Sequence, residues 1–295
     1  MNLIPTLIMG LSLGSAYALV ALGIVILHKG SGVLNLAHGS IAVLGAYVAA
    51  VTAGTLGFFG GVLAGMLAAG LVALLVERLL IQRIRNAPLI SLAIMTIGIE
   101  VLLQTDITRR IGTQILQLGQ PWGTDSAEIL GVVVPWNRLV TIGAAVVVVL
   151  IFIAAFRFSS WGISMRAAAE DRETAELVGI RLNRVTMTTW VTAGALAALA
   201  GIMLTGAPAP GLTPALSLVV LRAFAAALIG GLDSVAGALV GGMIVGMVEA
   251  VTATFQSNLS FLGLGLSDVA AFMVMFLVLL VRPQGLFGRK EAVRV

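Results

Sequence analysis

Runs of about twenty apolar residues, almost free of charged side chains, recur along most of this chain. A helix needs about 20 such residues to cross the hydrocarbon core of a bilayer. Only 10% of the residues are charged, whereas soluble domains carry about 25%. A soluble fold of 295 residues could not cover the apolar surface of a chain that is 59% hydrophobic. The natural solvent of this chain is therefore lipid.

The runs predict an all-α fold, a polytopic helical membrane protein with eight or nine transmembrane segments. We expect one membrane domain over residues 1–295 and no soluble domain. The sequence Gly230-Gly231-Leu232-Asp233 interrupts one region, which is either two short spans or one broken, re-entrant element. The predicted spans are residues 4–27, 36–56, 60–76, 88–104, 139–156, 186–207, 216–232, 234–250 and 262–281.

The Lys and Arg residues predict the orientation, because cytoplasmic loops carry an excess of both. One side of the predicted topology holds the loop at Lys29, the loop around residues 78–85, the loop 157–184 and the segment after residue 281. That side has 13 of the 17 basic residues, and the other side has three. Nine spans then place the N-terminus outside and the C-terminus in the cytoplasm.

The polar loop 157–184 contains a segment of good helix formers, Met165 to Val178, followed by Gly179. Glycine often ends a helix, so we expect one helix here. Small alanines, Leu177 and Val178 offer a smooth surface beside several charged residues. Such a helix can dock into a groove on a soluble partner. A solvated connector between two spans would have the same composition.

Two glycine-rich stretches interrupt apolar regions, one from residue 30 to 39 and one from residue 230 to 237. Paired broken segments indicate a transport pathway. The candidate pathway residues in them are Asn35, His38, Gly230, Gly231 and Asp233. The alternative role for Asn35 and His38 is to satisfy the backbone groups that a broken helix leaves free.

Arg222 lies inside a predicted span. A charge at the centre of a membrane helix costs roughly 2.5–3.5 kcal/mol on insertion scales, so its side chain should face protein or water. It is either a pathway-lining cation that meets a substrate carboxylate or the partner of Glu249 or Glu100 in a structural ion pair. Glu100 and Glu249 could alternatively form a proton relay.

Four motifs occur in order along the chain. They are residues 34–39 (Leu-Asn-Leu-Ala-His-Gly), residues 166–180 (Arg-Ala-Ala-Ala-Glu-Asp to Ala-Glu-Leu-Val-Gly-Ile), residues 222–231 (Arg-Ala-Phe to Ile-Gly-Gly) and residues 282–288 (Arg-Pro-Gln-Gly-Leu-Phe-Gly). Together they resemble the permeases of ABC importers of the branched-chain amino acid (LivH) type. Two positions depart from that pattern: Leu36 replaces the usual phenylalanine, and Asp233 follows the glycine pair where a small residue is usual.

The resemblance implies a permease of the bacterial inner membrane that translocates branched-chain or other small amino acids. It also implies three kinds of partner: a second permease, two cytoplasmic ATPase subunits and an extracytoplasmic binding protein. The loop 157–184 would be the coupling loop that contacts the ATPase. Its candidate coupling residues are Arg166, Ala168, Glu170, Asp171, Ala175, Gly179 and Ile180.

The sequence lacks the Gly-x-x-x-x-Gly-Lys-Ser/Thr phosphate loop, so any ATP must be hydrolysed by another chain. It has no cysteine and no zinc-hydrolase or nucleophile-turn motif. We therefore expect no enzyme activity, no catalytic residues, no metal, no cofactor and no nucleic acid. Two functions stay open beside amino acid import: an ABC permease for urea or short amides, and an ATP-independent secondary transporter that uses Arg222, Glu100 and Glu249.

Overall fold

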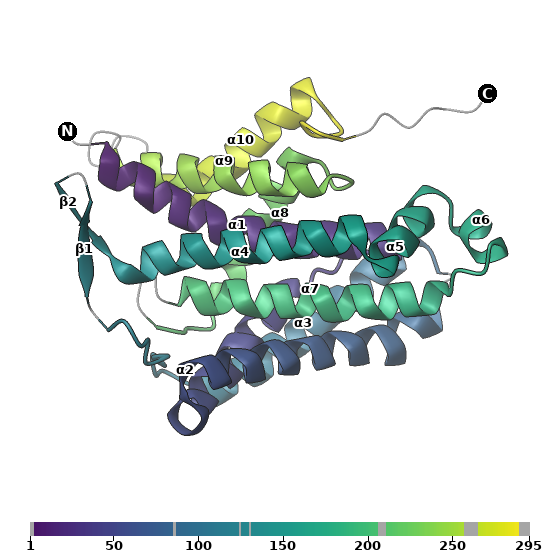
Figure 1. The fold of residues 1–295 in the computed structure, drawn as a ribbon, viewed down its shortest axis with the longest axis horizontal. Coiled ribbons are helices and arrows are strands. Elements are labelled where there is room, and N and C mark those ends of the chain that lie inside the picture. Colours follow the sequence, from purple (N-terminus) through teal and green to yellow (C-terminus); the bar gives the residue numbers. More distant parts are fainter. Residues whose placement is uncertain are drawn as a thin grey trace.

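The apolar runs fold into helices that lie side by side in the computed structural model (Figure 1). The structure describes residues 3–84, 87–123, 125–129, 131–205, 211–256 and 265–288. Its elements are α1 (Ile4–Ser31), α2 (His38–Leu79), the 3₁₀ turn η1 (Ile81–Ile84), α3 (Leu89–Ile111), β1 (Ser126–Ile129), β2 (Val132–Pro135), α4 (Trp136–Phe158), α5 (Ser160–Glu170), α6 (Arg172–Leu177), α7 (Leu182–Leu204), α8 (Leu216–Gly230), α9 (Val235–Thr254) and α10 (Leu266–Val281).

Within those described ranges, six helices are long and apolar enough to span a membrane, and α8 and α10 are shorter apolar helices. One of the six, α2, folds back on itself at Gly57, whose φ of 71° is left-handed. A β-carbon on Gly65 would collide with the backbone of Gly45, so the two halves of α2 pack in antiparallel contact. These halves are the predicted spans 36–56 and 60–76.

The other predicted spans also correspond to helices, with ends that shift by up to seven residues, the largest shift being at the end of α3. The predicted interruption is confirmed, because α8 ends at Gly230 and α9 begins at Val235. The start of the predicted span 262–281 and the end of the span 186–207 lie outside the described residues. The same is true of Arg85, Arg289, Lys290 and Arg294.

Two features differ from the prediction. A short antiparallel hairpin of β1 and β2, with Ser126 opposite Pro135, joins α3 to α4.

The prediction of one helix from Met165 to Val178 was wrong, because the chain forms α5 and α6 with a break at Asp171. The Asp171 carboxylate accepts hydrogen bonds from the backbone N–H and the hydroxyl of Thr174. An aspartate that bonds nearby backbone in this way favours a helix start over a helix interior.

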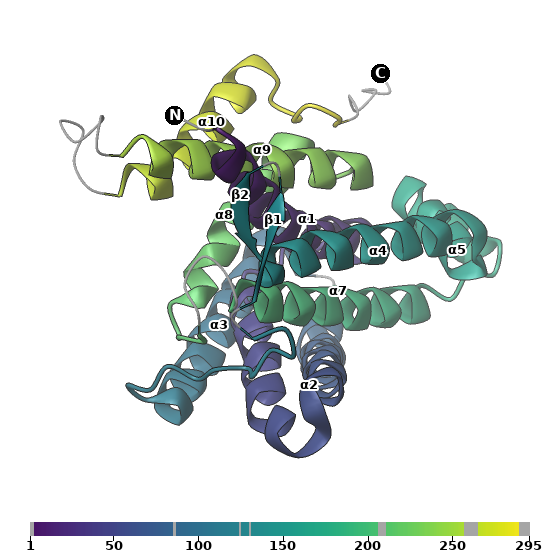
Figure 2. The same cartoon turned by 60° about the vertical axis from the view of Figure 1, so that its left-hand side comes forward.

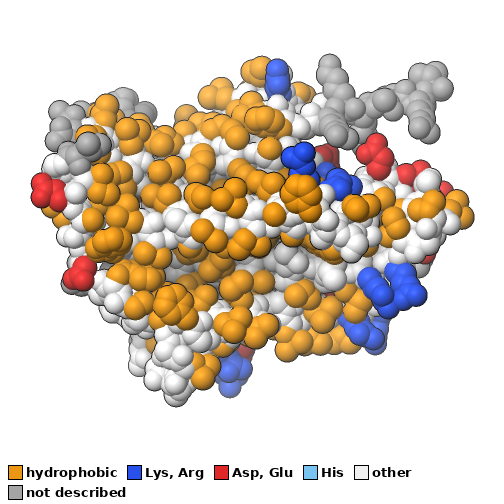
Figure 3. Space-filling view, in the orientation of Figure 1, with side chains coloured by type: hydrophobic (Ala, Val, Ile, Leu, Met, Phe, Trp, Pro, Cys, Tyr) orange, Lys and Arg blue, Asp and Glu red, His pale blue; other side chains and the backbone are white. Residues whose placement is uncertain are grey.

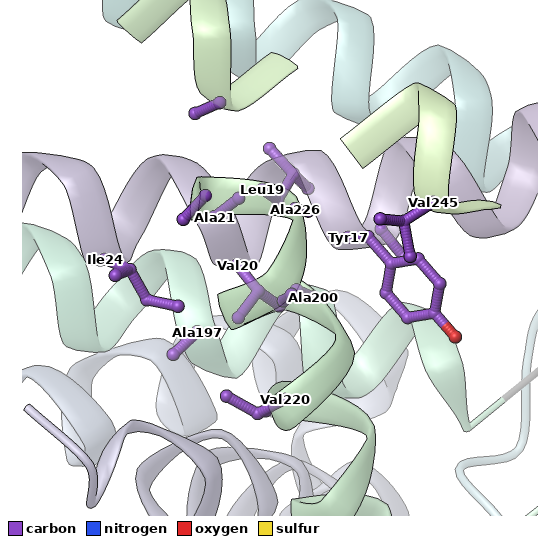
Figure 4. Close-up of a cluster of buried hydrophobic side chains, with 14 of the residues drawn as sticks. Tyr17, Leu19, Val20, Ala21, Ile24, Ala197, Ala200, Val220, Ala226 and Val245 are labelled. Carbon is purple, nitrogen blue, oxygen red and sulfur yellow. The ribbon is translucent and has the colours of Figure 1, made fainter. Parts of the chain in front are cut away.

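The first helix is the centre of the bundle. Most of α1 is buried, and it packs against α9, α7, α4 and α8. Figure 4 shows this core, in which Val20 and Ile24 of α1 lie among alanines of α7 and α8. Small residues allow such close packing, which is a main source of stability between helices in a bilayer. A β-carbon on Gly246 would collide with the backbone of Gly14, so α1 and α9 touch through their glycines.

The distribution of apolar and charged side chains on the surface changes along the direction of the helix axes. Figure 3 shows hydrophobic side chains over the middle of the visible face and several Lys and Arg clusters toward the end that carries α5 and α6. In Figure 1 the β1–β2 hairpin lies at the opposite end. An apolar band between two polar ends is what a bilayer-spanning protein requires.

Candidate functional site

Asn35 lies in the short connection between α1 and α2, His38 is the first residue of α2, and both are almost fully buried. The Oδ1 atom of Asn35 accepts a hydrogen bond from the backbone N–H of Ala37 at 3.0 Å. Thr96 of α3 braces the same connection, because its hydroxyl accepts from Leu36 N and donates to Leu34 O. The backbone freed by the break is thus satisfied by nearby polar side chains.

His38 is the first residue of α2 and packs against α1, where a β-carbon on Gly23 would lie 2.9 Å from its Nε2 atom. Its Nε2 atom has no hydrogen-bond partner among the described residues. Glu100 of α3 faces the first turn of α2, where its Oε2 atom accepts from the backbone N–H of Ser40 at 3.1 Å. A carboxylate in this position stabilises the positive N-terminal end of a helix. Glu100 thus has Ser40 as its partner, whereas the partners of Glu249 are Tyr17 and Arg222.

Arg222 is at the centre of a polar cluster formed by four helices. One guanidinium nitrogen donates to Glu249 Oε1 of α9 at 2.5 Å, and the other donates to Asp268 Oδ1 of α10 at 2.6 Å. Tyr17 of α1 donates to Glu249 Oε2 at 2.6 Å and accepts from Arg222 at 3.3 Å. The ion pair between Arg222 and Glu249 is confirmed. Sequence reasoning missed Tyr17 and Asp268, although a carboxylate inside the predicted span 262–281 was a usable signal.

Gly230 and Gly231 form a tight backbone junction. A β-carbon on Gly230 would collide with Gly237 of α9, and Gly231 has a left-handed φ of 101°. The segment after α10 adds to this junction, because Phe287 N donates to the carbonyl of Gly230 at 3.0 Å. Both glycines are therefore required by close backbone contacts between α8, α9 and the segment 282–288.

Asp233 follows this junction and faces the end of α1. Lys29 Nζ donates to the backbone carbonyl of Asp233 at 2.8 Å, and His28 Nδ1 lies 3.7 Å from its carboxylate. A cleft of about 690 Å³ lies between these residues and α5, and it is also lined by Arg166 and Glu170. The structure thus brings the candidate pathway residue Asp233 beside the predicted coupling loop, whereas Asn35 and His38 belong to the separate α1–α2 connection.

Among the predicted coupling residues, Glu170, Asp171 and Gly179 are exposed. Ala168 and Ala175 are buried, so they do not form the outer surface that the composition suggested. Arg166 also turns back, donating to the carbonyl of Phe156 and lying over its ring. Leu177 and Val178, by contrast, are 88% and 71% exposed. The buried alanines let α5 and α6 lie close to the bundle, which leaves these two side chains facing outward.

A glycine turn ends this coupling segment. Gly179 has a left-handed φ of 88°, and Ile180 N donates to the carbonyl of Ala175 at 3.0 Å. This arrangement is typical of a helix C-terminus that stops at glycine. The prediction that Gly179 ends a helix is confirmed, although the helix is the short α6. At the other end, Trp161 Nε1 donates to the Thr188 hydroxyl of α7 at 2.7 Å. This bond holds α5 against α7, and the ring of Trp161 also packs edge-on against Phe152 of α4.

These features agree with a match along nearly the whole chain. The family described as "Branched-chain amino acid transport system / permease component" matches residues 6–281. The chain belongs to this family. The resemblance found in the motifs is therefore confirmed, and the chain is a permease component of a transport system.

Relatives of similar length support the assignment. The high-affinity branched-chain amino acid transport system permease protein LivH of Escherichia coli K12 is 32% identical, over 97% of this chain and 96% of the relative. BraD of Pseudomonas aeruginosa, with the same description, is 32% identical over 98% and 97%. A probable LivH of Methanocaldococcus jannaschii is 29% identical over 92% and 88%. In fold, the chain resembles PsaBC from Streptococcus pneumoniae in complex with Fab, with a TM-score of 0.51, 16% identity and coverage of 92% and 89%.

Proposed function

We propose that this permease component imports branched-chain or similar small apolar amino acids across a bacterial inner membrane. The observation that carries the proposal is the full-length similarity to LivH and BraD, whose names state this transport. The chain has no phosphate loop of its own. The proposed partners are therefore two cytoplasmic ATPases, a second permease and an extracytoplasmic binding protein.

The proposed orientation has the start of α1 and the β1–β2 hairpin outside and the α5–α6 segment in the cytoplasm. It is supported by the excess of Lys and Arg in the loops on the α5–α6 side. We propose that α2 crosses twice, on either side of Gly57, as its antiparallel halves suggest. The whole chain then acts as one transmembrane domain.

In this proposal the segment 157–184 couples the ATPases to the transport pathway. Leu177 and Val178 project at its tip, where apolar side chains gain by contact with a soluble partner. Glu170, with the neighbouring Asp171, offers charges that can fix the register of docking. Arg166, Ala168, Ala175 and Gly179 have a supporting role, because they hold the shape of the segment.

Movement of the segment would reach the pathway through the cleft beside Asp233. Lys29 and His28 join Asp233 to the end of α1, while Arg166 and Glu170 line the other wall. ATPase closure that shifts α5 would therefore change the distance between this wall and the α8–α9 junction. The physical requirement is that the segment binds the two states of the ATPase with different free energies.

The test is uptake into liposomes that contain the chain together with its second permease and the ATPases. Loaded binding protein is added on one side and ATP on the other, and entry of radiolabelled leucine is measured. Leucine uptake that needs ATP and every partner is the expected result. Uptake of urea without leucine, or leucine uptake by this chain alone under a proton or sodium gradient, would contradict the proposal.

A further inference from the structure

In the proposed orientation, the cluster formed by Tyr17, Arg222, Glu249 and Asp268 lies within the span of the lipid hydrocarbon, with Asp268 in the first turn of α10. At 1.5 Å per residue, Tyr17 is about 20 Å along α1 from Ile4, and Arg222 is about 12 Å from the end of α8 at Gly230. The hydrocarbon core is about 30 Å thick. Helices α8, α9 and α10 contact one another in the upper part of Figure 2. In Figure 4 the Tyr17 hydroxyl points away from the apolar core.

The cluster is buried on one side and open on the other. Tyr17 is 1% exposed and Glu249 is 7% exposed. The side chains of Arg222 and Asp268 are 20% and 61% exposed. Charged side chains at membrane depth are costly in lipid and normally face a partner or a water-filled cavity. The open side of this cluster is therefore turned away from lipid in the working transporter.

The charges of the cluster do not cancel. One guanidinium meets two carboxylates, so one negative charge remains. The buried pair of Arg222 and Glu249 is held by Tyr17 as well. In the pair with Asp268 the carboxylate is 61% exposed, so this pair is far more accessible than the pair with Glu249. A ligand could therefore displace Asp268 from Arg222 without disturbing the buried pair.

We propose that this cluster binds the zwitterionic head of an α-amino acid during translocation. The ligand carboxylate accepts from the guanidinium nitrogen of Arg222 that now donates to Asp268. The released Asp268 carboxylate accepts from the ligand ammonium. Glu249 and Tyr17 keep Arg222 in position from the buried side. This inference rests on the proposed function, and it adds the place and the chemistry of substrate recognition within this chain.

Exposed apolar side chains lie close to Arg222 and Asp268 in the sequence of α8 and α10. Leu218 lies one helical turn before Arg222, on the same face of α8, and is 62% exposed. Leu221 and Val269 are 49% and 53% exposed. An amino acid held by Arg222 and Asp268 can thus place an apolar side chain against α8. Urea carries neither charge and has no apolar group, so this arrangement favours an amino acid.

The test measures binding of leucine to the purified transporter complex in nanodiscs, without the binding protein, by saturation-transfer NMR. Leucinamide, which lacks the carboxylate, and 4-methylpentanoate, which lacks the ammonium, are expected to bind at least about tenfold more weakly than leucine. Asp268→Asn is expected to weaken leucine binding about tenfold. Asp106→Asn is the matched control, because Asp106 is also an exposed partner of an arginine, Arg110, in α3.

A second variant separates binding from stability. Arg222→Gln combined with Glu249→Gln removes both buried charges and keeps groups that can hydrogen-bond. This double variant is expected to keep the melting temperature of the complex within a few degrees of wild type while losing leucine binding. Asp268→Glu keeps the carboxylate, so it is expected to retain most of the leucine binding that Asp268→Asn loses. Equal leucine binding in wild type, Asp268→Asn and the double variant would overturn the site while leaving ATP-driven leucine import intact.

Two other outcomes would also overturn the inference. Loss of the second permease from the purified Asp268→Asn complex would mean that the exposed charges form a subunit interface. A wild-type complex that binds no leucine, although it imports leucine from the binding protein, would exclude this cluster as a recognition site. If the wild-type complex imports urea and no leucine, the proposed function itself fails. The uptake and binding measurements therefore distinguish the two failures.

Discussion

Replacing Leu177 with serine is expected to weaken the docking of an ATPase while leaving the fold of this chain unchanged. Leu177 ends α6 and is 88% exposed, so nearly all of its side chain is available to a partner. Full burial of a leucine side chain contributes about 1.5–3 kcal/mol. At 1.4 kcal/mol per tenfold change, the dissociation constant should rise about 10- to 100-fold.

The assay is direct binding of the purified ATPase to permease complexes in nanodiscs, followed by ATPase stimulation on adding loaded binding protein. Val178→Ser should act in the same direction. Val133→Ser is its matched control, because Val133 is 69% exposed and belongs to β2 at the other end of the molecule. Unchanged dissociation constants for Leu177→Ser and Val178→Ser would refute the assignment of this tip as the docking surface.

Three further substitutions test how the fold is held, each by thermal unfolding or hydrogen exchange in detergent. Gly57→Ala should cost about 1–2 kcal/mol because φ is left-handed there. Gly54→Ala, in open helical space, should cost nothing, and equal losses for both would be contrary to the reasoning. Gly246→Val should lower the free energy of unfolding by about 1–3 kcal/mol, because it forces α9 away from α1. Gly98→Val is the control, since the space beside Gly98 is free. Similar melting temperatures for the two variants would contradict the contact between α1 and α9. Asp171→Ala should remove about 1 kcal/mol from α6 and speed its amide exchange, and unaltered exchange would exclude the cap.

Much of the helical layout followed from local sequence, because a lipid solvent restricts what the backbone can do. Each long apolar run had to become a helix, since a helix satisfies its backbone groups internally. The gap between the predicted spans 36–56 and 60–76 and the predicted interruption at Gly230-Gly231 are real breaks, because α2 folds back at Gly57 and α8 ends at Gly230. The hairpin of β1 and β2 escaped prediction, because it lies among polar residues where neither hydropathy nor length distinguishes a strand from a loop.

The candidate sites were only partly predictable, because they depend on contacts between distant residues. The charge of Arg222 inside a span required a partner, but hydropathy could not choose between Glu249 and Glu100 or reveal Asp268 and Tyr17. In the predicted coupling segment, composition suggested a docking surface made partly of alanines, and Ala168 and Ala175 are buried. Which face of α6 turns outward depends on how α5 packs against α1 and α7.

The sequence by itself determined that lipid surrounds this chain, which segments form its long apolar helices, and which family the chain resembles. Those properties depend on local composition and on motifs that are contiguous in the chain. The tertiary structure alone decided that α1 is the central helix, that Asp171 starts a second helix, and that four helices bring Arg222, Glu249, Asp268 and Tyr17 together. The physical reason is that close packing, hydrogen bonds and ion pairs join residues far apart in the chain, such as Tyr17 and Glu249, which are 232 positions apart; no local pattern encodes such contacts.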